Sequence, residues 1–338
     1  MITGVSRIAK GVAAFAFAAS LMLPSATMAQ EGELQPYTPA EGISGSIEAD
    51  GSSTVGPVVE ALAEEFAPVQ GDVQVTVNIS GTGGGFTRFC NGETDLQNAS
   101  RPIKDSEIES CIESGVNYFV FEIAYDGISV VVNPENDFVD CLTVDQLGQL
   151  WAPDSTVSTW ADLNPEWPAE TISLYGPGPD SGTFDYFTGE VNGEEGVSRT
   201  DYTPSEDDNV LVAGVSGDAN ALGYFGFAYY EQNMDSLKLV SVDNGNGCVA
   251  PSTETISDLS YDALSRPLFI YVNAESFMRP EVQEFMRFAI ATAPELVGEV
   301  GYVQSPANVY LEDQARVEAA IAGEIGPDGP LTDATPTS

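Results

Sequence analysis

Three short segments rich in glycine, serine and threonine each stand between an expected strand and an expected helix. They are Gly51-Ser52-Ser53-Thr54, Thr82-Gly83-Gly84-Gly85 and Asp180-Ser181-Gly182-Thr183. The first N–H groups of a helix have no intrahelical partner, and the helix dipole favours negative charge beside them. Glycine allows close backbone approach, and hydroxyl groups add donors. One such segment alone is an ordinary turn with an N-cap, but three together predict a site for a desolvated anion.

The residue types that are missing exclude several kinds of chemistry. The chain has no histidine, which excludes Ser-His triads, histidine-based zinc sites and imidazole general bases. None of the three segments is a P-loop, because no lysine follows the glycines in the required way. We therefore expect neither catalytic residues nor a metal, and no cofactor.

The overall charge excludes another class of partner. Eleven basic residues stand against 52 acidic ones in 338 residues, a formal net charge of -41. A protein that binds nucleic acid needs basic patches to neutralise phosphates, so no nucleic-acid partner is expected. Solvated carboxylates keep a protein soluble in concentrated salt, and we interpret the acidity as an adaptation to a saline habitat.

The N-terminal 29 residues have the pattern of a secretory signal peptide. Arg7 and Lys10 precede an apolar run over 11–23, and Thr27-Met28-Ala29 forms a small-x-small cleavage site. The run is too short to span a bilayer, so we expect cleavage after Ala29 and a periplasmic or secreted protein. Polar composition predicts a disordered leader over 30–43 and a disordered tail over 326–338.

The four cysteines fit an exported protein. Cys90, Cys111, Cys141 and Cys248 show no CxxC spacing, which argues against a zinc site or a redox motif. An even number in an oxidising compartment predicts two disulfides. Three pairings are possible, and we favour Cys90 with Cys111 as a local link and Cys141 with Cys248 as a bridge in a second domain.

Strand and helix patterns alternate along the chain, which predicts an α/β fold with ligand-facing loops at the strand ends. A strand over 45–49 leads into a helix over 57–66, and a second strand over 73–79 leads into a helix over 86–91. Later, a strand over 172–175 precedes an aromatic helix over 184–187. Two β-branched runs, 128–132 and 268–272, predict buried strands.

A series of motifs spread over residues 45–325 resembles the Pst-type phosphate-binding proteins, the receptors of phosphate ABC importers. In order, they are GSSTVGP, SGTGGGF, TDLQNASRPI, AYDGISVVVNP, LTVDQLGQLW, DSGTFDYF, ALGYFGFAYY and RPLFIYV. The resemblance implies a two-lobed, type II-like periplasmic-binding-protein fold, each lobe a mixed sheet flanked by helices, with the ligand cleft between the lobes. Lobe one would comprise 44–130 and 262–325, and lobe two 131–261, with crossings near 128–132 and 268–272.

The resemblance also implies a set of phosphate-binding residues from both lobes. Matched position by position, they are Ser53, Thr54, Val55, Thr82, Gly83, Ser181, Gly182 and Thr183. The best-known relatives carry an aspartate where this chain has Arg101, and an arginine where it has Pro177. Since a guanidinium fork suits a tetrahedral oxyanion, we add Arg101 to the predicted ligands.

The missing family aspartate bears on selectivity. Phosphate near neutral pH keeps a proton that a buried carboxylate can accept, whereas sulfate has none to donate. Another carboxylate should replace the aspartate, and Asp180, Asp185 and Asp126 are candidates that the sequence does not rank.

From these residues we expect a monomeric extracytoplasmic receptor that binds one inorganic phosphate and catalyses nothing. The resemblance implies that it delivers the ligand to the membrane permease subunits of an ABC importer. Two alternatives are a receptor for another tetrahedral oxyanion and a phosphatase that uses the same loops to hold a phosphoryl group.

Overall fold

The computed structural model describes residues 32–329. The fold described below is that of the compact unit that begins at Leu34. The predicted signal peptide lies outside the described residues. None of the helices described is long and apolar enough to cross a membrane.

The strands form one mixed sheet that changes neighbours along β4. The strand order is β2-β1-β3-β10-β4-β8-β6-β7, while β9 pairs with both β4 and β5. β4 is long enough to pair with β10 over its first ten residues and with β8 and β9 over its last five. The strands are β1 (Gly45–Gly51), β2 (Val73–Val77), β3 (Leu96–Ala99), β4 (Tyr118–Val132), β5 (Cys141–Thr143), β6 (Ser173–Gly176), β7 (Thr203–Pro204), β8 (Ala221–Gly226), β9 (Lys238–Asp243) and β10 (Ser265–Asn273).

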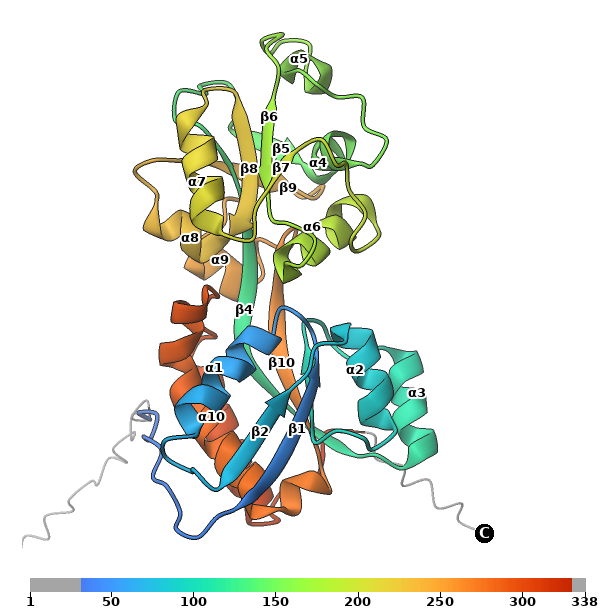
Figure 1. The fold of residues 1–338 in the computed structure, drawn as a ribbon, viewed down its shortest axis with the longest axis vertical. Coiled ribbons are helices and arrows are strands. Elements are labelled where there is room, and N and C mark those ends of the chain that lie inside the picture. The colour runs from blue at the N-terminus through green and yellow to red at the C-terminus, as the bar shows by residue number, and fades with distance from the viewer. Residues whose placement is uncertain (1–31, 330–338) are drawn as a thin grey trace, which may run out of the picture. The chain divides into compact units, whose positions relative to one another are not determined.

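Two groups of elements result, and β4 runs from one into the other (Figure 1). We call the group around β1, β2, β3 and β10 lobe one, and the group around β5 to β9 lobe two. The helices of lobe one are α1 (Gly56–Phe66), α2 (Gly81–Cys90), α3 (Asp105–Ser114), α10 (Pro280–Val300) and α11 (Ala307–Ile321), with the 3-10 helix η1 (Ser276–Met278). Those of lobe two are α4 (Val144–Trp151), α5 (Trp160–Leu163), α6 (Gly182–Asn192), α7 (Asp208–Gly217), α8 (Phe227–Gln232) and α9 (Thr253–Ser257).

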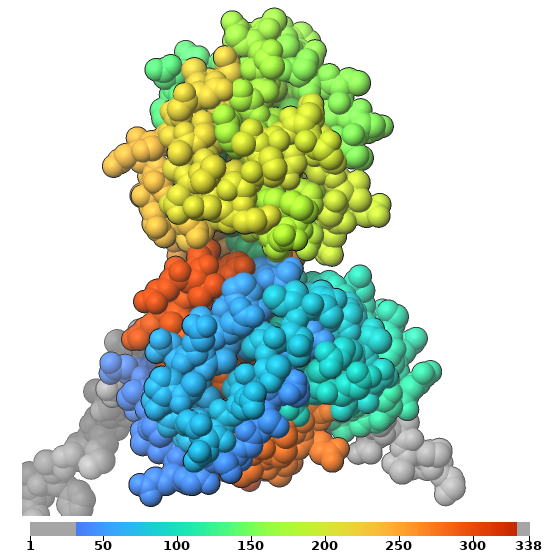
Figure 2. Space-filling model, in the orientation of Figure 1, coloured from blue at the N-terminus to red at the C-terminus, as the bar shows by residue number. Residues whose placement is uncertain are grey.

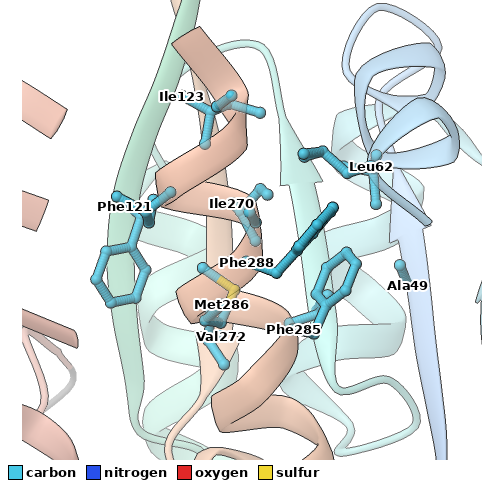
Figure 3. Packing of buried hydrophobic residues seen from close by; sticks show 14 of the residues in the cluster. Ala49, Leu62, Phe121, Ile123, Ile270, Val272, Phe285, Met286 and Phe288 are labelled. Atoms are coloured by element: carbon cyan, nitrogen blue, oxygen red, sulfur yellow. The ribbon is translucent and has the colours of Figure 1, made fainter. Parts of the chain in front are cut away.

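Each lobe has its own hydrophobic core. In lobe one, α10 presents apolar side chains at intervals of three and four residues and buries this face against the sheet. Figure 3 shows Phe285, Met286 and Phe288 of this helix packed near Ile270 and Phe121 of the two central strands. On β4, Ala124 packs in the core of lobe one and Tyr125 in that of lobe two. Leu264, just before β10, packs in the core of lobe two, and Leu268, within β10, in that of lobe one.

These changes refine the predicted crossings. Residues 128–132 pair within lobe two and 268–272 within lobe one, so the chain passes between the lobes a few residues earlier at each place. A further link lies beside the first crossing, where Tyr125 and Val303 exchange two backbone hydrogen bonds of 2.7 and 2.8 Å. The predicted lobe boundaries at 130/131 and 261/262 remain a prediction.

The predicted disorder is not matched by the described parts of the two ends. Tyr37 packs edge-on against Phe288 and donates a 2.8 Å hydrogen bond to Glu284, so the segment before β1 is held on lobe one without being a helix or strand. At the other end, Gly329 forms a backbone bridge with Tyr118. At both ends, a few contacts hold a segment whose polar composition alone predicts disorder.

Both favoured disulfides are present. Cys90–Cys111 joins the ends of α2 and α3, and Cys141–Cys248 joins β5 to the segment that follows β9. Each bond therefore lies within one lobe, and the predicted pairing is confirmed.

Candidate functional site

The first predicted anion loop, loop one, covers Ser52 to Val55 between β1 and α1. The Ser52 N–H donates to the Asn98 carbonyl at 2.9 Å, which ties the loop to β3. The Ser52 hydroxyl in turn accepts from the Thr54 N–H at 3.1 Å. α1 begins without a side-chain cap, and the N–H groups of its first turn donate instead to the backbone carbonyls of Ser52 and Val55.

The second predicted loop is itself the start of a helix. We expected the helix to begin at Phe86, but α2 begins at Gly81 and includes the glycines of loop two, residues 81–85. The Thr82 hydroxyl lies 3.1 Å from that of Ser100 and accepts from the Ser100 N–H at 3.3 Å. The helix is held by such neighbours rather than by the glycines, which are poor helix formers.

The third loop, residues Ser181 to Thr183, opens α6 in lobe two. The helix begins at Gly182 and not at the predicted Phe184, and the Ser181 hydroxyl caps it by accepting from the Thr183 N–H at 3.2 Å. Loops one and three meet across the lobes. A Cβ atom placed on Gly182 would lie only 2.7 Å from Thr54 Oγ1 and 3.0 Å from the Thr54 nitrogen. The approach of the two loops thus requires glycine at position 182.

In Figure 2 the two lobes meet at a narrow waist, where lobe-one atoms after β1 lie against lobe-two atoms. An arginine that the sequence analysis did not single out lies in this region. Arg266, at the start of β10, donates to Thr54 Oγ1 at 2.7 Å and to Asp126 Oδ2 at 3.1 and 3.2 Å. Its guanidinium also stacks over the Tyr186 ring, 3.7 Å from the centroid.

The sequence contained a signal for Arg266. It opens the motif RPLFIYV, and basic residues are so scarce that the reasoning used for Arg101 applies equally to it. Arg266 contacts loop one of lobe one, the crossing strand β4 and α6 of lobe two. It therefore connects loop one to α6, the helix that follows loop three.

Arg101 lies at the rim of the same region but is already paired. Its two terminal nitrogens meet both carboxylate oxygens of Glu107 at 2.9 and 2.7 Å. The side chain remains 29% exposed, so the ion pair is open to solvent on one side. Arg101 and Arg266 both line one cavity, so the site has a second guanidinium beside the predicted one.

That cavity has a volume of about 200 Å³ and lies between the lobes. Of the predicted ligands, it is lined by Thr82 and Arg101, and loop one connects to it through the hydrogen bond between Arg266 and Thr54. Its other lining residues are Ser100, Pro102, Tyr186, Gly189, Glu190, Glu195, Asp262, Ser265 and Pro267. The structure thus gathers the predicted residues in two adjoining places, one at the Thr54–Gly182 contact and one around this cavity.

The three candidate carboxylates have different surroundings. Asp180 is exposed, while Asp126 is fully buried and paired with Arg266. Burial raises the pKa of Asp126, and Arg266 opposes this shift. Burial is the main cause that raises the pKa of Asp185, and Glu195 adds to it. Arg266 and the Ser53 hydroxyl lower this pKa and offset part of the shift. Asp185 is therefore the candidate whose carboxylate faces loop one from the opposite lobe.

No group of three metal-ligating side chains gathers anywhere among residues 32–329. The polar groups at the lobe contact combine hydroxyls and two guanidinium groups with the carboxylates of Glu190, Glu195 and Asp262. The hydroxyls and guanidinium groups donate hydrogen bonds, which suits a small anion with several acceptor oxygens.

The comparisons with known proteins agree with this class of site. The family model described as PBP superfamily domain matches residues 37–293, and the chain belongs to that family. It is 48% identical to "Protein SphX" of Synechocystis over 81% of this chain and 82% of that protein. It is also 41% identical to "Phosphate-binding protein PstS" of Staphylococcus saprophyticus, over 84% of this chain and 88% of the relative.

Solved structures show the same fold. A crystal structure of a "possible phosphate binding protein" from Planctomyces limnophilus has a TM-score of 0.80 and 46% identity, covering 82% of this chain and 99% of that one. A putative phosphate ABC transporter substrate-binding protein from Clostridium perfringens, solved with bound phosphate, gives a TM-score of 0.53 at 27% identity. It covers 78% of this chain and 100% of its own. The predicted family resemblance and fold class are confirmed.

Proposed function

We propose that the protein is an extracytoplasmic receptor that binds one inorganic phosphate between its lobes and delivers it to the permease of an ABC importer. The observation that supports this most strongly is the meeting of Thr54 and Gly182 beside Arg266. Two loops from opposite lobes present donors there, and a ligand that accepts from both favours the closed arrangement. Relatives that carry phosphate in their names support the choice of ligand.

The proposed ligands extend the set predicted from the sequence by one residue. Each can contribute a hydroxyl, a backbone N–H group or a guanidinium to the binding of one tetrahedral anion. The set is Ser53, Thr54, Val55, Thr82, Gly83, Arg101, Ser181, Gly182, Thr183 and Arg266.

We assign the acceptor role of the missing family aspartate to Asp185. It lies in the first turn of α6, directly after loop three, and the Ser53 hydroxyl of loop one acts to lower the pKa of its carboxyl. A carboxylate there can accept a hydrogen bond from protonated phosphate, whereas fully ionised sulfate would meet it as an unpaired like charge. This role restores the preference for phosphate that Arg101 in place of an aspartate would weaken.

Isothermal titration calorimetry of residues 30–338 tests the proposed function. Phosphate should bind with a stoichiometry of one, and sulfate, molybdate and arsenate should be titrated in parallel. A flat phosphate titration, or sulfate displacing phosphate at equal concentration, would contradict the proposal. Incubation with phosphomonoesters should release no phosphate, because the chain has no histidine to activate a hydroxyl as a nucleophile. Steady release would instead support the phosphatase alternative.

A further inference from the structure

Gln97 on β3 is a fully buried side chain that connects two of the anion loops. Its Nε2 donates to the Thr82 carbonyl and to the Asn98 carbonyl, both at 3.0 Å. The Asn98 carbonyl also accepts from Ser52, the residue that begins loop one. One amide therefore contacts the first turn of α2 directly and loop one through a shared oxygen.

Two glycines make room for this amide. A Cβ atom on Gly85 would lie 2.1 Å from Gln97 Oε1, and one on Gly51 would lie 2.9 Å from the same oxygen. The Gly85 Cβ would also lie 2.6 Å from the Gly51 Cα. Loops one and two thus pack backbone to backbone around the glutamine, which no other residue type at 51 or 85 would allow without displacement.

The orientation of the amide follows from its surroundings. Both hydrogen-bond partners are carbonyl oxygens, so the nitrogen must face them, and the reversed amide would set oxygen against oxygen. Within the described residues, Oε1 has no hydrogen-bond partner. A buried acceptor without a partner lowers the stability of the fold, so we expect the Gln97 side chain to have a role other than stabilisation.

We propose that Gln97 is a positioning residue that fixes the spacing between loops one and two and thereby raises the affinity for phosphate; this inference rests on the proposed function. Gln97 acts through Thr82. Its donor holds the Thr82 carbonyl, while the Thr82 hydroxyl is set by Ser100. A binding site loses affinity when the residues around its ligand groups allow these groups to shift by even a fraction of an ångström.

Gln97→Met tests the inference, since it keeps the volume and removes both donated hydrogen bonds. Gln70→Met is the matched control: Gln70 is also buried in lobe one, and its Nε2 donates to Tyr37 Oη at 3.0 Å and to the Ala40 carbonyl at 2.9 Å. Both variants should unfold at lower urea concentration than the wild type. Only Gln97→Met should weaken phosphate binding in calorimetry, by about tenfold, which corresponds to one lost hydrogen bond.

A double-mutant cycle distinguishes positioning from general destabilisation. Thr82→Ala removes the ligand hydroxyl but keeps the backbone carbonyl that Gln97 holds, so in this background Gln97→Met should weaken phosphate binding less than it does in the wild type. The inference would be overturned if the two losses of phosphate affinity simply multiplied in the double variant. It would also be overturned if Gln97→Met and Gln70→Met bound phosphate with equal affinity. If Gln97→Met does not fold, Gln97→Asn takes its place, since the shorter side chain keeps an amide but cannot reach the Thr82 carbonyl. A wild-type protein that fails to bind phosphate would instead refute the proposed function.

Discussion

Replacing Arg266 by methionine should uncover the buried carboxylate that it now neutralises. Arg266 donates two hydrogen bonds to Asp126 and one to Thr54, and only 13% of its side chain is exposed. Asp126 is buried to 99%, so the variant leaves a carboxylate with no partner of opposite charge. Breaking a buried ion pair from one side costs about 3–5 kcal/mol, a large share of the stability of an ordinary domain.

This cost should depend on pH in a definite direction. Burial already raises the pKa of Asp126, and Arg266 is the group that opposes the shift. Without the arginine, the folded-state pKa rises further above the unfolded value. The folded variant then holds its proton at pH values where the folded wild type has released it, so the loss of stability relative to the wild type is smallest below the folded-state pKa of the wild type. It grows by about 1.4 kcal/mol for each pH unit between the folded-state pKa values of the wild type and the variant.

Urea unfolding followed by tryptophan fluorescence measures this effect. The free energy of unfolding of Arg266→Met should be subtracted from that of the wild type at several pH values between 4 and 8, at constant salt. The difference should increase with pH, and adding Asp126→Asn to the variant should remove most of the increase. A difference that does not change with pH, or that survives in the double variant, would refute the assigned burial and pairing of Asp126.

Three further outcomes are expected of the binding site. Arg101→Ala should weaken phosphate binding at least tenfold while leaving the fold intact, because Glu107 holds the guanidinium at the cavity; calorimetry showing wild-type affinity would remove Arg101 from the site. Asp185→Asn should raise the affinity for sulfate relative to phosphate, and an unchanged ratio in a competition titration would leave the acceptor unidentified. Phosphate affinity should hold between about 0.1 and 1 M sodium chloride, since buried contacts are screened much less than the acidic surface. A steep fall with salt would contradict a desolvated site.

The sequence predicted local features of the site better than long-range ones. Glycine, serine and threonine between a strand and a helix marked all three loops, because each part of an anion site takes its donors from a few consecutive residues. The starts of α2 and α6 were placed too late, since glycine-rich segments have low helix propensity. In α2 the helical turn is supported by Ser100 and Gln97, which follow much later in the chain.

Arg266 was missed for the same physical reason. It reaches Thr54 across 212 positions of the chain, and no periodicity or spacing expresses such a contact. Only its register on β10, directly opposite Asp126 on β4, brings the arginine to the loops. The disulfide pairing was easier, because each bond closes within one lobe and joins cysteines that the order of elements already brings near.

The backbone bridge between Tyr125 and Val303 has a consequence for how the halves of the receptor separate. Tyr125 and Val303 both belong to the core of lobe two, although Val303 lies between α10 and α11 of lobe one. The chain therefore reaches from lobe one to lobe two at three places: along β4, at the start of β10 and in the segment before α11. Three adjacent connections restrict twisting of one half against the other, so we expect opening to occur mainly as bending across them.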